Sequence, residues 1–284
     1  MPSQREIRRR IGSSRNIKQI TRAMQFVAAS KLKRAQDATL QSRAYADKID
    51  EVLADLAAVL GADDHPLLAK REGGTRAIVL ITTDRCLAGS LNTNTIRFVA
   101  EQLTADETDA RVITVGRKGH AAMRRSHVPI AAAFEGFGDR PNFASVIALA
   151  RLLTDDYLAG TYSTIDLVYP RFVSTLVQRP ALDRLLPVEP SDDADQGIPG
   201  RQFIFEPNAD AVLRQLMPRY VATRIFQAVL ELTASEQSAR MVAMKNATEN
   251  AQDLIEDLTL TYNKVRQANI TREMIEIATG AEAA

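Results

Sequence analysis

The chain has 284 residues, of which 45% are hydrophobic and 25% charged, and its formal net charge is +1. This composition is ordinary for a globular chain, and it excludes selection of a partner by overall charge. The single cysteine, Cys86, excludes an internal disulfide and a cysteine-based metal site. The sequence also lacks the run of about 18 apolar residues that a membrane-spanning helix requires.

The first predicted element is a helix from residue 3 to about residue 60, because this stretch has no proline and only one glycine, Gly12. An average globular helix has about 11–12 residues, so this one is unusually long. A seven-residue period predicts a seam for a second helix. Its members are Ile17, Met24, Ala38, Tyr45, Val52 and Val59, with Ile20 and Val27 in the intervening row and Lys31 as a charged interruption.

The composition of the first 43 residues resembles that of a transit peptide, since Lys and Arg far outnumber Asp and Glu. The helical pattern nevertheless continues through residue 60 without a break that would suggest processing. We therefore expect no transit peptide.

Residues 61–207 alternate between short apolar strands and helices. Strands are predicted at 76–82, 111–115, 164–169 and 174–178, and helices at 91–103, 117–126 and 142–159. This alternation predicts a Rossmann-like α/β domain with a partly parallel sheet. Residues 190–200 are rich in Ser, Asp, Gly and Pro and are predicted to form a surface loop.

The C-terminal part is predicted to hold a short helix, 208–217, followed by a long helix that begins at Pro218 and ends near residue 279. Apolar and small residues alternate there by three and four, which is the signature of a coiled coil. They are Met241, Met244, Thr248, Ala251, Ile255, Leu258, Tyr262, Val265 and Asn269. We expect two long terminal α-helices forming an antiparallel coiled-coil shaft (1–60 plus 208–284), with an α/β foot (61–207) inserted between them.

The predicted α/β domain lacks the motifs of a nucleotide-binding or catalytic site. No GxGxxG follows the first strand, and the P-loop pattern is absent. The three histidines have no metal-ligand spacing. Gly116-Arg-Lys-Gly119 follows the second strand, where either an anion site or a helix-capping turn is possible, and the turn is the better interpretation. We predict no catalytic residue, metal ligand or cofactor, which favours a structural or coupling protein over an enzyme.

Charge is distributed unequally over the two terminal helices. The N-terminal helix carries a basic stripe, made of Arg8, Arg15, Lys18 and Arg22, and a second basic cluster, made of Lys31, Lys33 and Arg34. The C-terminal helix carries an acidic row of Glu249, Asp253 and Asp257. A basic stripe fits nucleic-acid phosphates, acidic loops of a protein partner, or a solvated surface. Nucleic-acid binding does not explain the acidic row.

Two helical runs carry a family likeness: IKQITRAMQFVAASKLKRAQ at residues 17–36 and ASEQSARMVAMKNATENAQDLIEDLTLTYNKVRQANITREMIEI at residues 234–277. Both closely resemble the γ subunit of F-type ATP synthases. The turn TTDRCLAGSLN at residues 82–92 is similar to the signature turn of that family, usually DRGLCGGLN. It departs from the pattern at Cys86, Ala88 and Ser90. No inserted dithiol segment is present, so thiol regulation is not expected.

The resemblance implies a non-catalytic central rotor that couples proton flow through the membrane sector to ATP synthesis or hydrolysis. In this family the paired helices stand inside a ring of three α and three β subunits, and the foot binds the ε subunit and the c-ring. The chemistry takes place on β. The chain is then peripheral to the membrane through the c-ring, at the cytoplasmic face of a bacterial plasma membrane, and needs no cofactor and no nucleic acid.

The resemblance also implies contact residues on the shaft. Those expected to meet the acidic lever region of β are Met24, Lys31, Lys33, Arg34 and Arg240. Arg266 and Gln267 resemble a pair that hydrogen-bonds to a loop of β, and Thr271 lies one turn beyond. Three alternatives stay open at this point: the stalk subunit of a V- or A-type ATPase, a basic coiled-coil protein that binds nucleic acid, and an enzyme.

Overall fold

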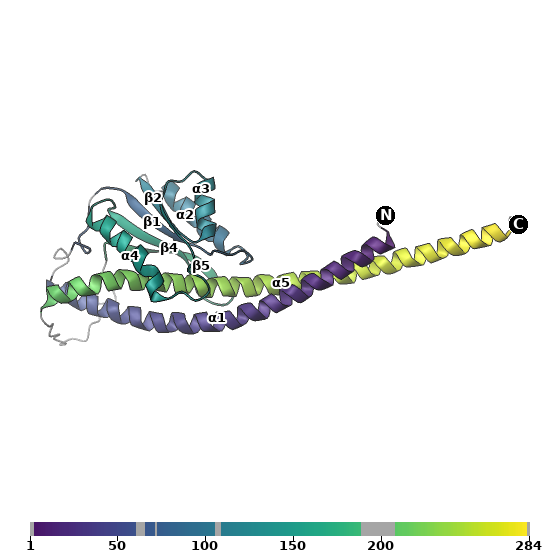
Figure 1. Cartoon of the computed structure of the whole chain (residues 1–284), viewed down its shortest axis with the longest axis horizontal. Helices are drawn as coiled ribbons and strands as arrows, with labels where there is room; N and C mark the ends of the chain where they lie inside the picture. Colours follow the sequence, from purple (N-terminus) through teal and green to yellow (C-terminus); the bar gives the residue numbers. More distant parts are fainter. Residues whose placement is uncertain (1–2, 61–65, 72, 106–108, 189–207, 283–284) are drawn as a thin grey trace. The chain divides into compact units, whose positions relative to one another are not determined.

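The computed structural model describes residues 3–60, 66–71, 73–105, 109–188 and 208–282. Two long helices, α1 (Gln4–Leu60) and α5 (Ala209–Glu282), flank the strands and shorter helices in the sequence (Figure 1). The chain forms two compact units. The helical unit comprises Met1–Ala29 and Arg240–Ala284, and the sheet unit comprises Ser30–Ala239. Each long helix therefore contributes residues to both units.

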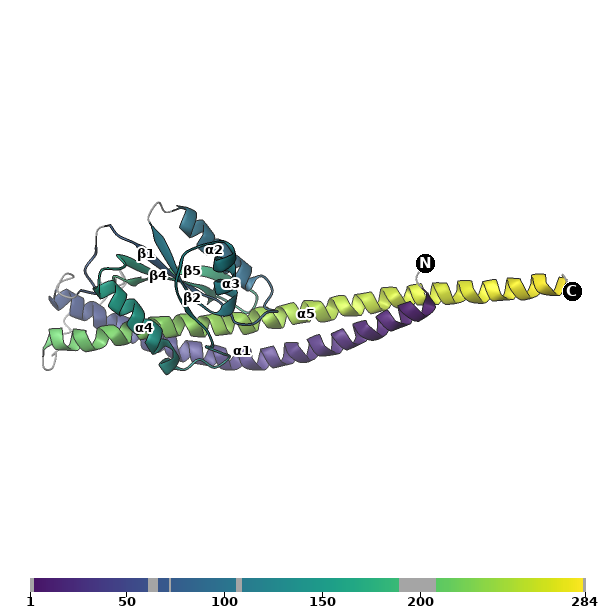
Figure 2. The same cartoon turned by 45° about the horizontal axis from the view of Figure 1, so that its top comes forward.

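The sheet of the sheet unit has five strands in the order β3-β2-β1-β4-β5. Their bounds are β1 (Arg76–Ile81), β2 (Ala110–Val115), β3 (Ile130–Phe134), β4 (Thr164–Phe172) and β5 (Gln178–Leu186). Strands β1, β2, β4 and β5 are labelled in Figure 2. The first four strands are parallel, and β5 pairs with β4 in the antiparallel direction. The expected Rossmann-like domain with a partly parallel sheet is therefore confirmed.

Three helices connect the parallel strands: α2 (Leu91–Ala105), α3 (Arg117–Arg125) and α4 (Phe143–Leu158). The chain moves outward from β1 to β2 to β3 and then returns past β1 to β4. Because such crossovers are right-handed, α2 and α3 must cover one face and α4 the opposite face. The packing agrees. One core lies between the sheet and α2 and α3, and the larger core joins the other face to α4, α1 and α5.

The predicted strands and helices are confirmed from residue 76 to residue 169, with one strand missing from the prediction. The missed strand is β3, IAAAF, whose alanines give no strong strand signal. The strand predicted at 174–178 is wrong. Val173 N–H donates to the Val177 carbonyl and Val177 N–H donates to that of Ser174, so these residues form the turn before β5. Arg179 and Pro180 weaken the strand signal of β5, which is an edge strand where proline is tolerated.

The predicted helix break at Pro218 is also wrong, since α5 runs continuously through that residue. The helix begins where predicted: the Asn208 side chain accepts a hydrogen bond of 2.8 Å from the Ala211 N–H. Pro218 removes one backbone hydrogen bond from the helix. Leu213, Met217 and Val221 on either side of it are buried in the larger core, and this packing offsets the loss.

The predicted division into shaft and foot does not follow the bounds of the two compact units. Ile49 and Leu53 of α1, like Ile225 and Val229 of α5, belong to the larger core of the sheet unit. The inner stretches of both long helices are therefore part of one packed body with the sheet. Shaft and foot stay a predicted functional division, and residues 190–200 lie outside the described part of the chain.

Candidate functional site

The helical unit is an antiparallel helix pair with a narrow seam. Ile7 and Ile11 of α1 pack with Ile255 of α5, and Leu258, Tyr262 and Val265 lie against this cluster. Farther along the pair the seam is polar. Lys18 Nζ donates a hydrogen bond of 2.6 Å to Gln252 Oε1, and the Thr21 and Thr248 hydroxyls share one of 2.7 Å. Residue numbers thus increase along α1 while those of the contacting residues decrease along α5, as expected for antiparallel pairing.

The predicted seam of the C-terminal helix is confirmed, because every member from Met241 to Asn269 is buried or half-buried. The predicted seam of the N-terminal helix is wrong at most of its positions, although Met24 is half-buried in the helical unit, as are Lys31 and Ala38 in the sheet unit. Ile17, Ile20 and Val27 are 50%, 60% and 55% exposed, and the seam follows a different row that includes Ser14, Lys18, Thr21 and Ala28. Thr248 and Gln252 supply polar partners for that row, so the more apolar row remains on the outside.

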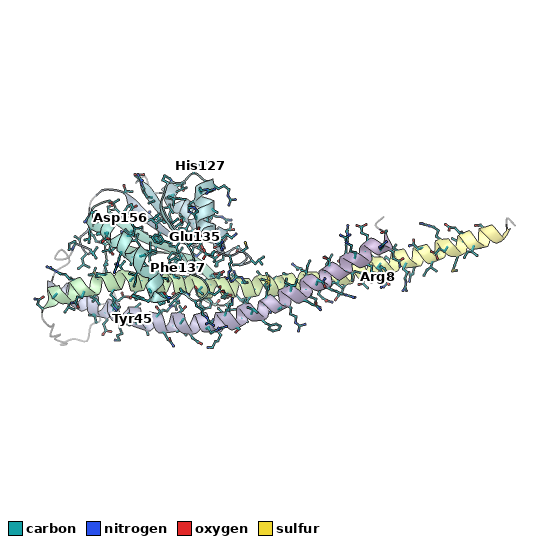
Figure 3. The ribbon with its side chains drawn as sticks, in the orientation of Figure 1. Arg8, Tyr45, His127, Glu135, Phe137 and Asp156 are labelled. Atoms are coloured by element: carbon teal, nitrogen blue, oxygen red, sulfur yellow. The ribbon has the colours of Figure 1, made fainter. Side chains whose placement is uncertain are left out.

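Five of the predicted contact residues belong to the helical unit. Met24 is half-buried and Arg240 is 9% exposed, whereas Arg266, Gln267 and Thr271 are exposed. The Thr271 hydroxyl donates a hydrogen bond of 2.9 Å to the Gln267 carbonyl within the helix. The side chains of Arg266 and Gln267 are therefore accessible on α5, whereas that of Arg240 is buried. Arg8 of the basic stripe also lies on the exposed surface of α1 (Figure 3).

The other three predicted contact residues, Lys31, Lys33 and Arg34, belong to the sheet unit. Lys31 Nζ forms an ion pair of 2.6 Å with Asp139. Lys33, whose side chain is 75% exposed, pairs with Asp37 one turn along α1 at 2.9 Å. Arg34 contacts the Ser30 hydroxyl and carbonyl. The basic cluster is therefore partly neutralised by this chain's own carboxylates.

The turn after β1 is fixed at its base by α3. The Arg117 N–H donates to Asp84 Oδ1 at 3.0 Å, the Lys118 N–H to the Thr83 carbonyl at 3.2 Å, and the Gly119 N–H to Thr82 Oγ1 at 2.8 Å. These are the backbone donors that an anion would need at the start of α3. The turn interpretation of Gly116–Gly119 is therefore confirmed, and the anion-site alternative is wrong.

Gly116 is required at the start of α3 by two features of the backbone. Its φ is +92°, a value that residues other than glycine rarely adopt. A Cβ at this position would lie 2.0 Å from the Thr82 carbonyl oxygen. The close approach of Gly116 to Thr82, the residue after β1, brings the start of α3 against the turn.

Beyond its fixed base, the turn is exposed. Cys86 and Leu87 are both on the surface, and Leu87 has a φ of +68° although it carries a branched side chain. That conformation costs a non-glycine residue roughly 1–2 kcal/mol. Arg85 NH1 forms an ion pair of 3.1 Å with Asp139, the same carboxylate that binds Lys31. Sequence reasoning missed Asp139, which is separated from both cations by more than fifty residues.

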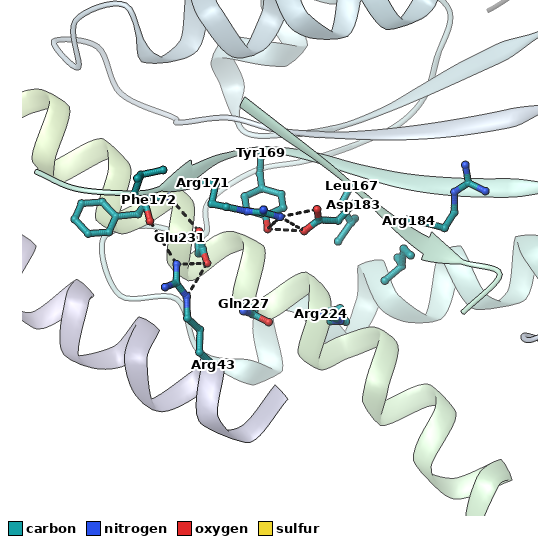
Figure 4. A pocket seen from close by; sticks show the side chains of 12 residues that line it. Arg43, Leu167, Tyr169, Arg171, Phe172, Asp183, Arg184, Arg224, Gln227 and Glu231 are labelled. Atoms are coloured by element: carbon teal, nitrogen blue, oxygen red, sulfur yellow. Dashed lines mark hydrogen bonds and ion pairs between the residues drawn. The ribbon is translucent and has the colours of Figure 1, made fainter. Parts of the chain in front are cut away.

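A cavity of about 460 Å³ lies between strands β4 and β5 and the helices α1 and α5 (Figure 4). Arg43 donates to Glu231 at 3.0 and 2.7 Å, and Glu231 also accepts from the Phe172 N–H. Arg171 binds Asp183 at 2.6 and 2.8 Å. The other two lining arginines pair with carboxylates as well: Arg184 with Asp166 and Arg224 with Asp50. Since each cation has its own anion, the network joins the helices to the sheet.

Tyr169 completes this network. Burial raises the pKa of its phenol, and the Asp183 carboxylate beside it raises that pKa further. The hydroxyl therefore stays protonated at neutral pH and donates a hydrogen bond of 2.7 Å to Asp183. No sequence motif predicted this hydrogen-bond network, because its members are scattered over α1, β4, β5 and α5.

Within the described ranges, the His, Cys, Asp and Glu side chains form no group of three or more that would hold a metal ion. The same part of the chain contains no helix that is both long and apolar enough to span a membrane.

Two long terminal helices, paired antiparallel in the helical unit and separated in sequence by a doubly wound α/β domain, define a stalk-type helical protein with an inserted domain. A family model described as ATP synthase matches residues 3–284. The ATP synthase gamma chain of Chloroflexus aurantiacus is 47% identical over 290 residues, and that of Pelotomaculum thermopropionicum is 43% identical over 283 residues. Both alignments cover 100% of this chain and 99% of the relative.

Solved structures agree with this assignment. The central stalk and c-ring structure of Tetrahymena thermophila mitochondrial ATP synthase contains a chain of 25% identity with a TM-score of 0.61, covering 80% of this chain and 99% of that one. A chain of the Euglena gracilis mitochondrial ATP synthase has the same fold, with a TM-score of 0.69 at 22% identity, covering 99% of this chain and 94% of that one. The chain belongs to the ATP synthase gamma-chain family. It is therefore a central-stalk rotor subunit and not itself the catalyst.

Proposed function

We propose that this chain turns as the central rotor inside a ring of three α and three β subunits and is driven, through an ε subunit and a c-ring, from the cytoplasmic face of a bacterial plasma membrane. The named relatives are bacterial gamma chains. The similar Euglena chain is part of an F1 and c-ring assembly. Both findings support this setting for the chain.

The observation that carries the proposal is the exposed apolar surface of the helical unit. Large apolar side chains are exposed on both helices: Ile17, Ile20, Phe26 and Val27 on α1, and Leu254, Leu260, Ile270, Met274, Ile275 and Ile277 on α5. Apolar exposure on this scale marks a surface that a partner covers. A ring of subunits around the pair would cover both helices at once.

Rotation acts on the catalytic subunits through unequal contacts. A partner shifts a conformational equilibrium only if it contacts the alternative states differently. The helical unit has a basic stripe on α1 and the acidic row Glu249, Asp253 and Asp257 on α5, and all three acidic residues are exposed. Each β subunit would meet a different part of this charge pattern at each rotor angle. The chemistry then takes place on β, while this chain determines which β site changes affinity.

The predicted contact residues fall into three groups under this proposal. Arg266 and Gln267, with Thr271 one turn on, are exposed and would touch β directly. Met24 and Arg240 are half-buried and buried, so they would act at the edge of the helix pair. Lys31, Lys33 and Arg34 would meet acids of β in competition with the carboxylates that bind Lys31 and Lys33 in this chain.

Native mass spectrometry of the complex, isolated from membranes through an affinity tag inserted in residues 190–200, tests the assembly. The expected particle contains one copy of this chain with three copies each of two larger nucleotide-binding subunits. Recovery of the chain as a free dimer, or with bound nucleic acid, would show that the rotor assignment is wrong.

The contact residues need a separate test, in which Arg266→Ala and Gln267→Ala are combined in the assembled complex. Both side chains are exposed, so assembly should be unchanged while proton pumping per hydrolysed ATP falls. Arg272→Ala is the matched control, because Arg272 is exposed on the same helix and is not a predicted contact. Equal proton pumping per ATP in the unmodified complex, the double variant and the Arg272→Ala control would exclude the Arg266 and Gln267 contact.

A further inference from the structure

One carboxylate in the sheet unit collects donors from three separate elements. Asp139 lies between β3 and α4, and its side chain is 23% exposed. Its Oδ2 accepts from Lys31 of α1 at 2.6 Å and from Arg85 of the turn after β1 at 3.1 Å. Its Oδ1 accepts from the Gln237 amide of α5 at 3.4 Å. Asp139 is therefore the point where both long helices and the exposed turn are joined.

The surroundings of Asp139 are predominantly basic. Arg34 and Arg140 line a small cavity together with Lys31 and Asp139. Asp84, Arg117 and Glu236 line a second cavity that Asp139 and Arg85 border. Without the Asp139 charge, Lys31 and Arg85 would face each other as like charges, and mutual repulsion would drive the turn away from α1.

The base and the exposed part of the turn are held by different contacts. Thr83 and Asp84 are fixed by hydrogen bonds to Asn92 and to the backbone of Arg117 and Gly136. Beyond them, the ion pair of Arg85 with Asp139 links a turn side chain to the carboxylate that also binds α1 and α5. The next residues are the exposed Cys86 and the strained Leu87.

We propose that Asp139 is a positioning residue: it holds the turn Thr83–Ser90 against the two long helices and fixes the Lys31 ammonium beside it. Its effect on coupling rests on the proposed function above, whereas its effect on the turn does not. Asp139 acts through Arg85 and Lys31 and need not touch a partner subunit.

Cys86 is a built-in reporter, because it is the only cysteine of the chain and is exposed in this turn. The test measures the rate at which an uncharged maleimide labels Cys86 in the isolated full-length chain over a range of pH. The plateau rate at high pH, where the thiol is fully ionised, reports access to the turn. The midpoint of the curve reports the local charge, so the two effects separate.

Asp139→Asn should raise the plateau rate roughly two- to fivefold, the range expected for loss of a partly exposed ion pair. Glu135→Gln is the matched control, since Glu135 is exposed in the same segment between β3 and α4 (Figure 3). It removes the same charge and should leave the plateau unchanged. Asp139→Glu should restore slow labelling. An unchanged plateau in Asp139→Asn, or an equal rise in Glu135→Gln, would overturn the proposal.

The assembled complex supplies the second readout, proton pumping per hydrolysed ATP. Asp139→Asn should lower this ratio and Glu135→Gln should not. If Cys86 labelling rises while pumping per ATP is unchanged, the proposed role in coupling is refuted. If the chain fails to assemble as a rotor at all, the labelling result still decides whether Asp139 positions the turn.

Discussion

The two units of this chain are stabilised in different ways. The sheet unit buries strands on both faces, and side chains such as Ile78, Val79 and Leu149 are completely inaccessible. The helical unit has one narrow seam, in which apolar contacts at Ile7, Ile11 and Ile255 give way to hydrogen bonds between polar side chains. The sheet unit can therefore fold on its own core, whereas the helical unit buries little and leaves much apolar surface for partners.

Folding stability and function therefore depend mainly on different parts of the chain. Substitutions in the sheet unit should act mainly on folding, because most of its side chains are committed to neighbours in the same chain. Substitutions in the helical unit should act mainly on the assembled machine.

Gly116→Ala should strongly destabilise the sheet unit. The new Cβ would lie 2.0 Å from the Thr82 carbonyl oxygen, a backbone atom that cannot move alone. The expected loss of unfolding free energy is on the order of 4 kcal/mol, measured by urea denaturation. Gly136→Ala is the control, because Gly136 also has a positive φ, +84°, but nothing lies within 4 Å of its added Cβ. Equal losses for both variants would mean that backbone strain, and not the clash, dominates.

Asp166→Asn should break the buried ion triad at the start of the sheet. Asp166 is fully buried and accepts from Arg76 at 2.7 Å and from Arg184 on the other side. The Arg76 side chain is only 12% exposed, so it would lose its anion in a poorly solvated place. We expect a loss of about 3 kcal/mol. Asp183→Asn removes a carboxylate that is 39% exposed and should cost about 1 kcal/mol or less. A larger loss of unfolding free energy in Asp183→Asn than in Asp166→Asn would contradict the importance of the buried Asp166 ion triad.

The sequence predicted the fold class and most elements because burial leaves a strong pattern there. After its first residue, Arg76, β1 is apolar, since these residues are buried on both faces of the sheet. β5 was missed because an edge strand tolerates Arg179, Pro180 and Arg184. The apolar row of α1 led to the wrong seam for a physical reason. Periodicity shows that a helix has an apolar face, but it does not distinguish a face for the partner helix from one left exposed.

Single residues of the candidate site could be named from the sequence, but their pairings could not. Arg266 and Gln267 were named from the quoted helical run; both side chains are exposed, and their contact with a partner stays a prediction. The pairing of Lys31 with Asp139 joins residues 108 positions apart and carries no local signal. The network of Arg43, Glu231 and Tyr169 was missed for the same reason, since tertiary packing alone brings the three together.

Met24→Lys tests the helical unit as a functional surface. Met24 is half-buried on α1, so a lysine there can extend its ammonium to the surface without unfolding the pair. A new contact with acids of β would be worth about 1 kcal/mol, and proton pumping per ATP should fall by up to fivefold while assembly is unchanged. Met24→Leu is the control, because it is similar in size and uncharged. Normal pumping in Met24→Lys would exclude this contact.

Gly12→Ala should produce the smallest effect, and in the opposite direction. Gly12 is an exposed interior residue of α1, and nothing lies within 4 Å of an added Cβ. Alanine should therefore stabilise the helix by about 0.5–1 kcal/mol. Hydrogen exchange of the amides near residue 12 should slow correspondingly, while the urea midpoint of the sheet unit should not move. If the urea midpoint of the sheet unit rises together with the hydrogen-exchange protection near residue 12, the two units unfold together. The proposed division of folding and function between the two units would then be wrong.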